Sequence, residues 1–182
     1  MEMNPLTGQE VSPRDMQDAL PGIILIQRHE LVEQLPALLG RFGTMTASRR
    51  DQLLTKFNGN PPAGAEVIMQ LEGDSGVNLP GEYKEFLRRQ NGGEGFVGNA
   101  YAILWRAEEL LEMNKSYQVH EYAPGLFLFG SDGGGEAFAF DVRTAAKPIV
   151  SVPFVGMELK EARPVASNFN EFLQALFTSY II

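Results

Sequence analysis

The sequence predicts an α+β domain with a largely antiparallel sheet, and two observations lead to this fold class. Segments with helical periodicity come first, a cluster of short strand-like segments follows, and an amphipathic segment closes the chain. Within the strand cluster, three consecutive glycines separate two apolar segments; they are Gly133, Gly134 and Gly135. Such a run is typical of a hairpin connection, because glycine adopts positive φ angles at no steric cost. We therefore expect at least one of these glycines to have a positive φ.

The first 57 residues are predicted to form an N-terminal extension, 1–57, that is mostly helical with one short strand. GIILIQ at 22–27 is the strand candidate, because it is apolar, β-branched and too short for a helix. Segments 29–39 and 48–57 show helical spacing, and Phe57 is on the packing side of the second.

Residues 58–64, NGNPPAG, are the clearest break in the chain. Two prolines, two glycines and two asparagines in seven residues are typical of a linker or long turn. We therefore expect the main domain to occupy residues 65–182.

The elements of this domain follow from periodicity and from the residues that interrupt it. The segment 79–89 carries the clearest early helix, with a buried stripe at i, i+3 and i+4 formed by Tyr83, Phe86 and Leu87. We expect the turn residues Asn91, Gly92 and Gly93 to stop it. The other expected helices are 65–76, 106–114 and 168–177, and the expected strands are 100–104, 126–130, 136–141 and 148–153. In the closing helix, Asn168 and Glu171 have the spacing of a capping box.

Composition restricts the class of function. The 182 residues contain no cysteine, which excludes a disulfide framework, thiolate metal sites and cysteine nucleophiles. The net charge of −8 is uneven, with −1 over residues 1–57 and −7 over residues 58–182. Such an acidic domain repels nucleic acid and attracts a basic partner, although many soluble proteins are simply acidic. No apolar run is long enough for a membrane span, and we expect a cytoplasmic protein that binds neither nucleic acid nor membranes.

The glycine-rich stretch GSDGGGEAF at 130–138 is not a phosphate-binding loop by its residues. It lacks the Lys and Ser or Thr of a P-loop, it precedes a strand rather than a helix, and its acids would repel phosphate. Its acids Asp132 and Glu136, with Asp141, could form a metal site or an acid/base pair. Carboxylates in hairpins more often cap turns or remain solvated, so a structural role is favoured.

The other candidate side chains form no recognisable catalytic set. His29 and His120 are not part of an H-E-x-x-H arrangement, and no G-x-S-x-G elbow occurs. Trp105, Tyr101 and Tyr117 could form an aromatic ligand patch, although such residues are more often core. We expect no catalytic residue, cofactor or metal.

Two motifs together resemble those of the SUKH superfamily. They are LPGEYKEFLRRQNGGEG and LFLFGSDGGGEAFAFD, followed by a closing FNEFLQALF, and the resemblance covers about residues 65–179. It implies helices packed on a curved sheet and no catalytic residues. It also implies a protein-binding role, because many bacterial members are immunity proteins that neutralise toxins.

The expected function is therefore a non-catalytic immunity protein that binds a basic toxin domain. The alternatives are a housekeeping scaffold or regulator of the same fold, and an enzyme or small-ligand binder at the 130–141 loop. The expected partner-binding residues are the loop acids Glu94, Asp132 and Glu136. The expected structural turn residues are Asn91, Gly92, Gly93, Gly133, Gly134, Gly135 and Asp141.

Overall fold

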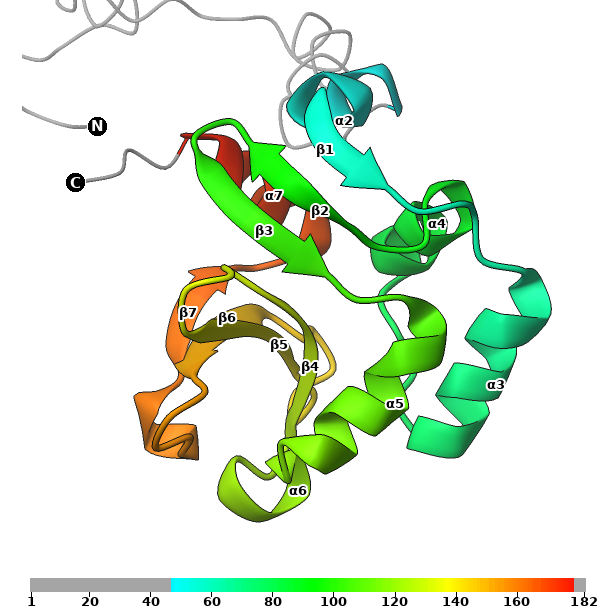
Figure 1. The fold of residues 1–182 in the computed structure, drawn as a ribbon. Helices are drawn as coiled ribbons and strands as arrows, with labels where there is room; N and C mark the ends of the chain where they lie inside the picture. Colours follow the sequence, from blue (N-terminus) through cyan, green and yellow to red (C-terminus); the bar gives the residue numbers. More distant parts are fainter. Residues whose placement is uncertain (1–46, 179–182) are drawn as a thin grey trace, which may run out of the picture. The chain divides into compact units, whose positions relative to one another are not determined.

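The computed structural model describes residues 47–178, which form the α+β fold that the sequence predicts (Figure 1). A single seven-stranded sheet has the order β1-β2-β3-β4-β5-β6-β7, and every neighbouring pair is antiparallel. The strands are β1 (Lys56–Gly59), β2 (Gly93–Val97), β3 (Ala100–Leu104), β4 (Leu126–Ser131), β5 (Glu136–Asp141), β6 (Ile149–Pro153) and β7 (Arg163–Ala166). Figure 1 shows β4, β5 and β6 bending into an arc, so the sheet is curved.

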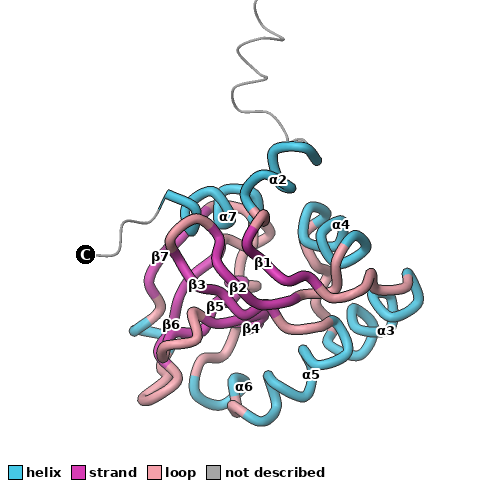
Figure 2. Tube along the Cα trace, turned by 45° about the horizontal axis from the view of Figure 1, so that its top comes forward, coloured by secondary structure: helices cyan, strands magenta, loops and turns pink. Residues whose placement is uncertain are grey.

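Helical segments precede β1, follow β7 and occupy the connections β1–β2, β3–β4 and β6–β7. They are α2 (Ala47–Leu53), α3 (Ala65–Ser75), α4 (Gly81–Arg89), α5 (Ala107–Ser116), α6 (Val119–Tyr122), the 3-10 turn η1 (Leu159–Glu161) and α7 (Phe169–Thr178). In Figure 2, α3, α4 and α5 lie together beside the strands, and α6 follows α5. The strand expected at 22–27 and the helix expected at 29–39 lie outside the described residues.

The core is an aromatic cluster between α4, α7 and the central strands. Tyr83 of α4 is fully buried, and its ring centroid lies 5.4 Å from that of Phe129, 5.1 Å from Phe140 and 5.0 Å from Phe169. Phe172 of α7 completes the cluster against Phe129 and Phe138. The stripe predicted on α4 is confirmed, because Tyr83, Phe86 and Leu87 have no exposed surface. The closing helix is confirmed too, with Asn168 Oδ1 accepting the Glu171 N–H at 2.9 Å.

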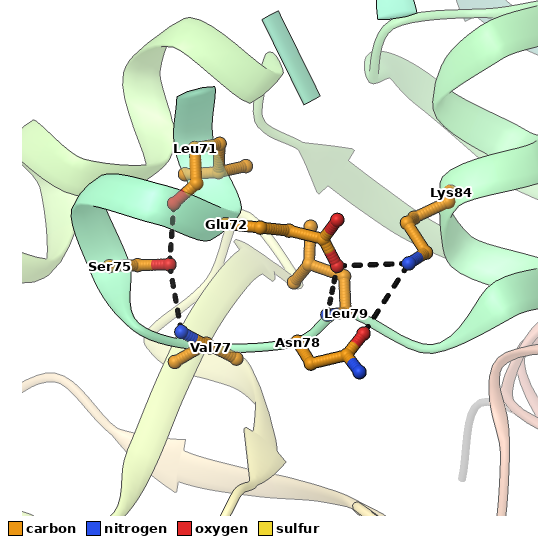
Figure 3. Close-up of polar contacts among 7 residues, drawn as sticks. All are labelled: Leu71, Glu72, Ser75, Val77, Asn78, Leu79 and Lys84. Atoms are coloured by element: carbon orange, nitrogen blue, oxygen red, sulfur yellow. Dashed lines mark hydrogen bonds and ion pairs between the residues drawn. The ribbon is translucent and has the colours of Figure 1, made fainter. Parts of the chain in front are cut away.

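The start of α4 is fixed by polar contacts with the end of α3, shown in Figure 3. Glu72 Oε1 accepts the Leu79 N–H at 2.7 Å and the Lys84 ammonium at 2.9 Å. Ser75 Oγ donates to the Leu71 carbonyl and accepts the Val77 N–H. These bonds give the N–H groups of Val77 and Leu79 a partner in the connection between the helices, and they tie Lys84 of α4 to Glu72 of α3.

A side chain substitutes for a strand where β3 leaves β4. These two strands are paired only at Ile103 with Ser131 and Leu104 with Gly130. Further along β4, Asn114 of α5 donates from Nδ2 to the Leu128 carbonyl and accepts the Leu128 N–H at Oδ1, both at 2.8 Å. The amide therefore satisfies the strand edge as a neighbouring backbone would.

The structure differs from the sequence prediction before residue 60. The helix expected over 48–57 ends at Leu53, and Phe57 lies instead in β1, which pairs with β2. β1 also extends into the segment 58–64, which was expected to be a linker. The rest of that segment is hydrogen bonded, with the Ala63 N–H donating to the Leu87 carbonyl. The predicted division between the extension 1–57 and the linker 58–64 remains a proposal. Because β1 belongs to the sheet, we would place the domain boundary before residue 56.

Candidate interaction surface on the open face of the sheet

The two faces of β2 and β3 differ in what covers them. α7 packs against both strands, and the side chains buried on that side include Val97, Ala102 and Leu104. Side chains alternate between faces along a strand, and directly paired residues share a face. The opposite face therefore carries the pairs Glu94 with Ile103 and Phe96 with Tyr101. We call these four residues the open face.

Two aromatic rings are displayed on the open face. Phe96 is 47% exposed and Tyr101 is 37% exposed, and their ring centroids are 5.3 Å apart in a T-shaped arrangement. Glu94 is exposed beside them and has no ion-pair partner among the described residues. Aromatic rings of this kind supply large contact area at protein interfaces.

In β2, the glycines on either side of Glu94 allow close packing against β1. Gly93 and Gly95 have φ of 143° and 144° and alternate with the exposed residues. A Cβ on Gly95 would lie 2.5 Å from the Lys56 carbonyl oxygen, so only glycine fits beside β1. The strand is therefore tightly apposed to β1 at the positions between its two displayed side chains.

The turn that follows β4 is organised by one carboxylate. Asp132 Oδ1 accepts the N–H groups of Gly134, Gly135 and Glu136 at 2.7, 2.9 and 3.0 Å. Burial raises the pKa of Asp132, but these backbone donors outweigh it and leave the pKa below its usual value. Gly133 has φ of 73°, which confirms the predicted hairpin with a glycine at positive φ.

The three acids expected to contact a partner are not brought together. Glu94 is on the open face, whereas the Asp132 carboxylate accepts hydrogen bonds from backbone N–H groups of its own turn. Ser131 pairs with Ile103 of the open face and with Ala137, so Ala137 lies on the same side of the sheet as the open face. Glu136 is the residue before Ala137 in β5. Glu136 therefore points to the other face, where its Oε2 is buried without a hydrogen-bond partner in the described part of the chain.

The Asn-Gly-Gly segment after α4 joins three elements. Asn91 Oδ1 accepts the Ala107 N–H at 2.8 Å at the start of α5, and Nδ2 donates to Glu108 Oε2 at 2.7 Å. A Cβ on Gly92 would lie 2.3 Å from the Leu104 carbonyl oxygen, and Gly93 begins β2. The helix itself ends at Arg89, and the next residue, Gln90, already has an extended backbone.

The acid at the end of β5 binds an arginine two residues on. Arg143 donates from Nε to Asp141 Oδ1 at 2.8 Å and from Nη2 to Oδ2 at 2.7 Å. This bidentate hydrogen bonding lowers the pKa of Asp141, although burial opposes the shift. The arginine stem also lies over Gly125, where a Cβ would be 2.4 Å from Arg143 Cγ.

The aromatic residues Trp105, Tyr101 and Tyr117 form two groups instead of one patch. Trp105 stacks on Tyr117 at 6.2 Å, and Tyr117 contacts Phe154 at 4.5 Å between ring centroids. Tyr101 pairs with Phe96, a residue that the sequence reasoning did not select. The alternation of Gly, Glu, Gly and Phe from 93 to 96 was the available signal.

Comparisons with known proteins place these features in a family. The chain matches the SMI1 / KNR4 family (SUKH-1) over residues 62–175, whereas no significant match to a curated protein is found. Across residues 47–178, no helix combines the length and apolarity of a membrane span, and no three His, Asp or Glu side chains cluster as a metal site would require. The matched region contains the open face, the Asn-Gly-Gly segment and the Gly133–Gly135 turn, and it spans more than half of the sequence. The protein therefore belongs to the SMI1/KNR4 (SUKH-1) family.

Proposed function

We propose that this protein is a non-catalytic protein-binding domain, and that it acts as an immunity protein that neutralises a toxin by stoichiometric binding. Family membership supports the binding role. The observation that carries the proposal is the open face, because it exposes two aromatic rings and a carboxylate on hydrogen-bonded strands. Such a surface offers rigid aromatic anchors at little cost in conformational entropy.

Charge supports a basic partner. Residues 58–182 have a net charge of −7, and opposite charge on a partner raises the rate of association. The structure separates the acids by their availability: Glu94 is exposed without an ion-pair partner in the described range, whereas Asp132 is bound to three backbone N–H groups. We therefore propose Glu94, and not Asp132, as the charged contact of the open face.

Chemistry at the 130–141 loop is less well supported. Asp132 Oδ1 already accepts three hydrogen bonds from the backbone of its own turn. Asp141 is likewise held by Arg143 through both carboxylate oxygens.

The test begins with the genes beside that of this protein, and any toxin domain encoded there is purified as the binding partner. We expect a 1:1 complex by light scattering and rescue of growth when the two proteins are co-expressed. The double variant Phe96→Ala/Tyr101→Ala should lose rescue and weaken binding by about 30-fold or more, since two aromatic anchors are removed. The matched control is Tyr122→Ala, because Tyr122 is an aromatic of α6 that is 47% exposed, as Phe96 is.

The charge is tested separately. Glu94→Lys should slow association, and the effect should shrink as salt rises, because ions screen exposed charges beyond about 10 Å. Equal binding by the wild type and the double aromatic variant would refute the open face as the interface. A gene neighbourhood without a toxin, together with a non-toxic binding partner, would favour the housekeeping scaffold of the same fold.

A further inference from the structure

The glycine turn lies against the open face. A Cβ built on Gly133 would be 3.1 Å from Tyr101 Cδ1, 3.4 Å from Tyr101 Cε1 and 3.7 Å from Ile103 Cδ1. The bare backbone at Gly133 therefore packs beside the Tyr101 ring. A methyl group there would force the ring or the turn to move by a few tenths of an ångström.

The turn is also well fixed. Asp132 Oδ1 holds three N–H groups, the Asp132 N–H donates to the Glu136 carbonyl at 3.0 Å, and the Phe154 N–H donates to the Gly135 carbonyl at 2.9 Å. A loop with this many internal bonds has few alternative conformations. The turn can therefore limit the positions that the neighbouring Tyr101 ring adopts.

We propose that the Asp132–Glu136 turn is a positioning element of the binding surface, and that Gly133 is the positioning residue that sets the orientation of the Tyr101 ring for the partner. This inference rests on the proposed function, in which the open face binds. It adds a role to the glycine-rich motif, whose hairpin geometry alone requires no contact with Tyr101. The orientation of an anchor ring matters because a misplaced ring must be reorganised at the moment of binding.

A positive φ alone does not explain Gly133, and the chain offers a matched control. Gly76, at the end of α3, has φ of 68°, close to the 73° of Gly133, but a Cβ there would meet no atom within 4 Å. Gly76→Ala therefore imposes the same kind of backbone strain without touching a neighbour. The difference between Gly133→Ala and Gly76→Ala isolates the contact with Tyr101.

The experiment is a double-mutant cycle on the full chain. Gly133→Ala and Gly76→Ala are each made with Tyr101 intact and with Tyr101→Ala, and urea unfolding and binding to the toxin domain are measured. We expect Gly133→Ala to weaken binding by about tenfold when Tyr101 is present and to have no further effect on binding in Tyr101→Ala. Its shift of the unfolding midpoint should shrink in the Tyr101→Ala background, whereas that of Gly76→Ala should stay the same.

The outcomes separate this inference from the proposed function. If the two shifts caused by Gly133→Ala are equal with and without Tyr101, the positioning role is refuted while the open face can still bind. If Tyr101→Ala binds the toxin domain as the wild type does, Tyr101 is not an anchor and the positioning role is refuted, whereas the open face itself is refuted only if Phe96→Ala/Tyr101→Ala also binds as the wild type does. Coupling in both measurements supports the proposal.

Discussion

Replacing Asp132 by asparagine is the sharpest test of how the glycine turn is held. The substitution keeps an oxygen acceptor but removes the charge that receives three backbone N–H groups at 2.7, 2.9 and 3.0 Å. Hydrogen bonds to a charged acceptor contribute about 1 kcal/mol more than neutral ones, and solvent reduces this at a partly exposed site. We therefore expect Asp132→Asn to lower the free energy of unfolding by about 1–2 kcal/mol at pH 7. The melting temperature should fall by about 2–4 °C for each kcal/mol.

The stabilisation that Asp132 provides should depend on pH in a definite direction. The pKa of Asp132 is lower in the folded chain than in the unfolded chain, where the pKa of an aspartate is about 4. Its contribution is therefore fully present above the unfolded pKa and is lost as pH falls through the folded pKa. The difference between wild type and Asp132→Asn should be constant above about pH 5 and should shrink in acid.

Urea unfolding followed by circular dichroism at several pH values measures this difference. Asp74→Asn is the matched control, because Asp74 is an exposed acid whose side chain has no hydrogen bond or ion pair within residues 47–178. The reasoning would be refuted by an Asp132→Asn variant as stable as the wild type at pH 7. A destabilisation that is equally large at pH 7 and at pH 3 would refute it as well.

Three further substitutions test other contacts. Tyr83→Phe should stabilise the fold by about 1 kcal/mol in thermal unfolding, because the Tyr83 hydroxyl is buried without a partner among the described residues; a loss of stability would show that the hydroxyl is satisfied. Asn114→Ala should cost about 2–4 kcal/mol and speed hydrogen exchange at the Leu128 amide, since both backbone groups of Leu128 lose their partner; unchanged exchange there would contradict the strand-like role of the amide. Gly95→Ala should cost about 2 kcal/mol or more in urea unfolding, because its Cβ would approach the Lys56 carbonyl to 2.5 Å; a cost below about 0.5 kcal/mol would mean that β1 yields easily.

The parts of the fold that sequence could predict are those with a strong apolar period. The stripe of Tyr83, Phe86 and Leu87 defined α4, and the repeat from Phe169 onward defined α7. β2 was missed because two of its three buried positions are Gly93 and Gly95, which carry no apolar side chain and resemble turn residues. Burial in this strand comes from close backbone packing, which hydrophobicity does not record.

The candidate site was predictable only in part, for a similar reason. Glu94 was selected as an exposed acid, and the structure places it on an exposed face. The selection of Asp132 rested on its place in a polar loop, but in Asp-Gly-Gly-Gly the following N–H groups turn back onto the carboxylate. The pairing of Phe96 with Tyr101 depends on the register of β2 and β3, which needs β2 to be identified first.

The position of β1 has a practical consequence for any shortened form of this protein. The family match begins at residue 62, whereas β1 ends at Gly59 and forms one border of the sheet. A fragment cut to the matched region would leave the backbone of β2 unpaired along one side. Its glycines place no side chains there to obstruct another chain, and unprotected strand borders recruit further strands and promote aggregation. We therefore expect a fragment that starts at residue 62 to self-associate at concentrations where one that starts at residue 47 stays monomeric, a difference that size-exclusion chromatography would detect.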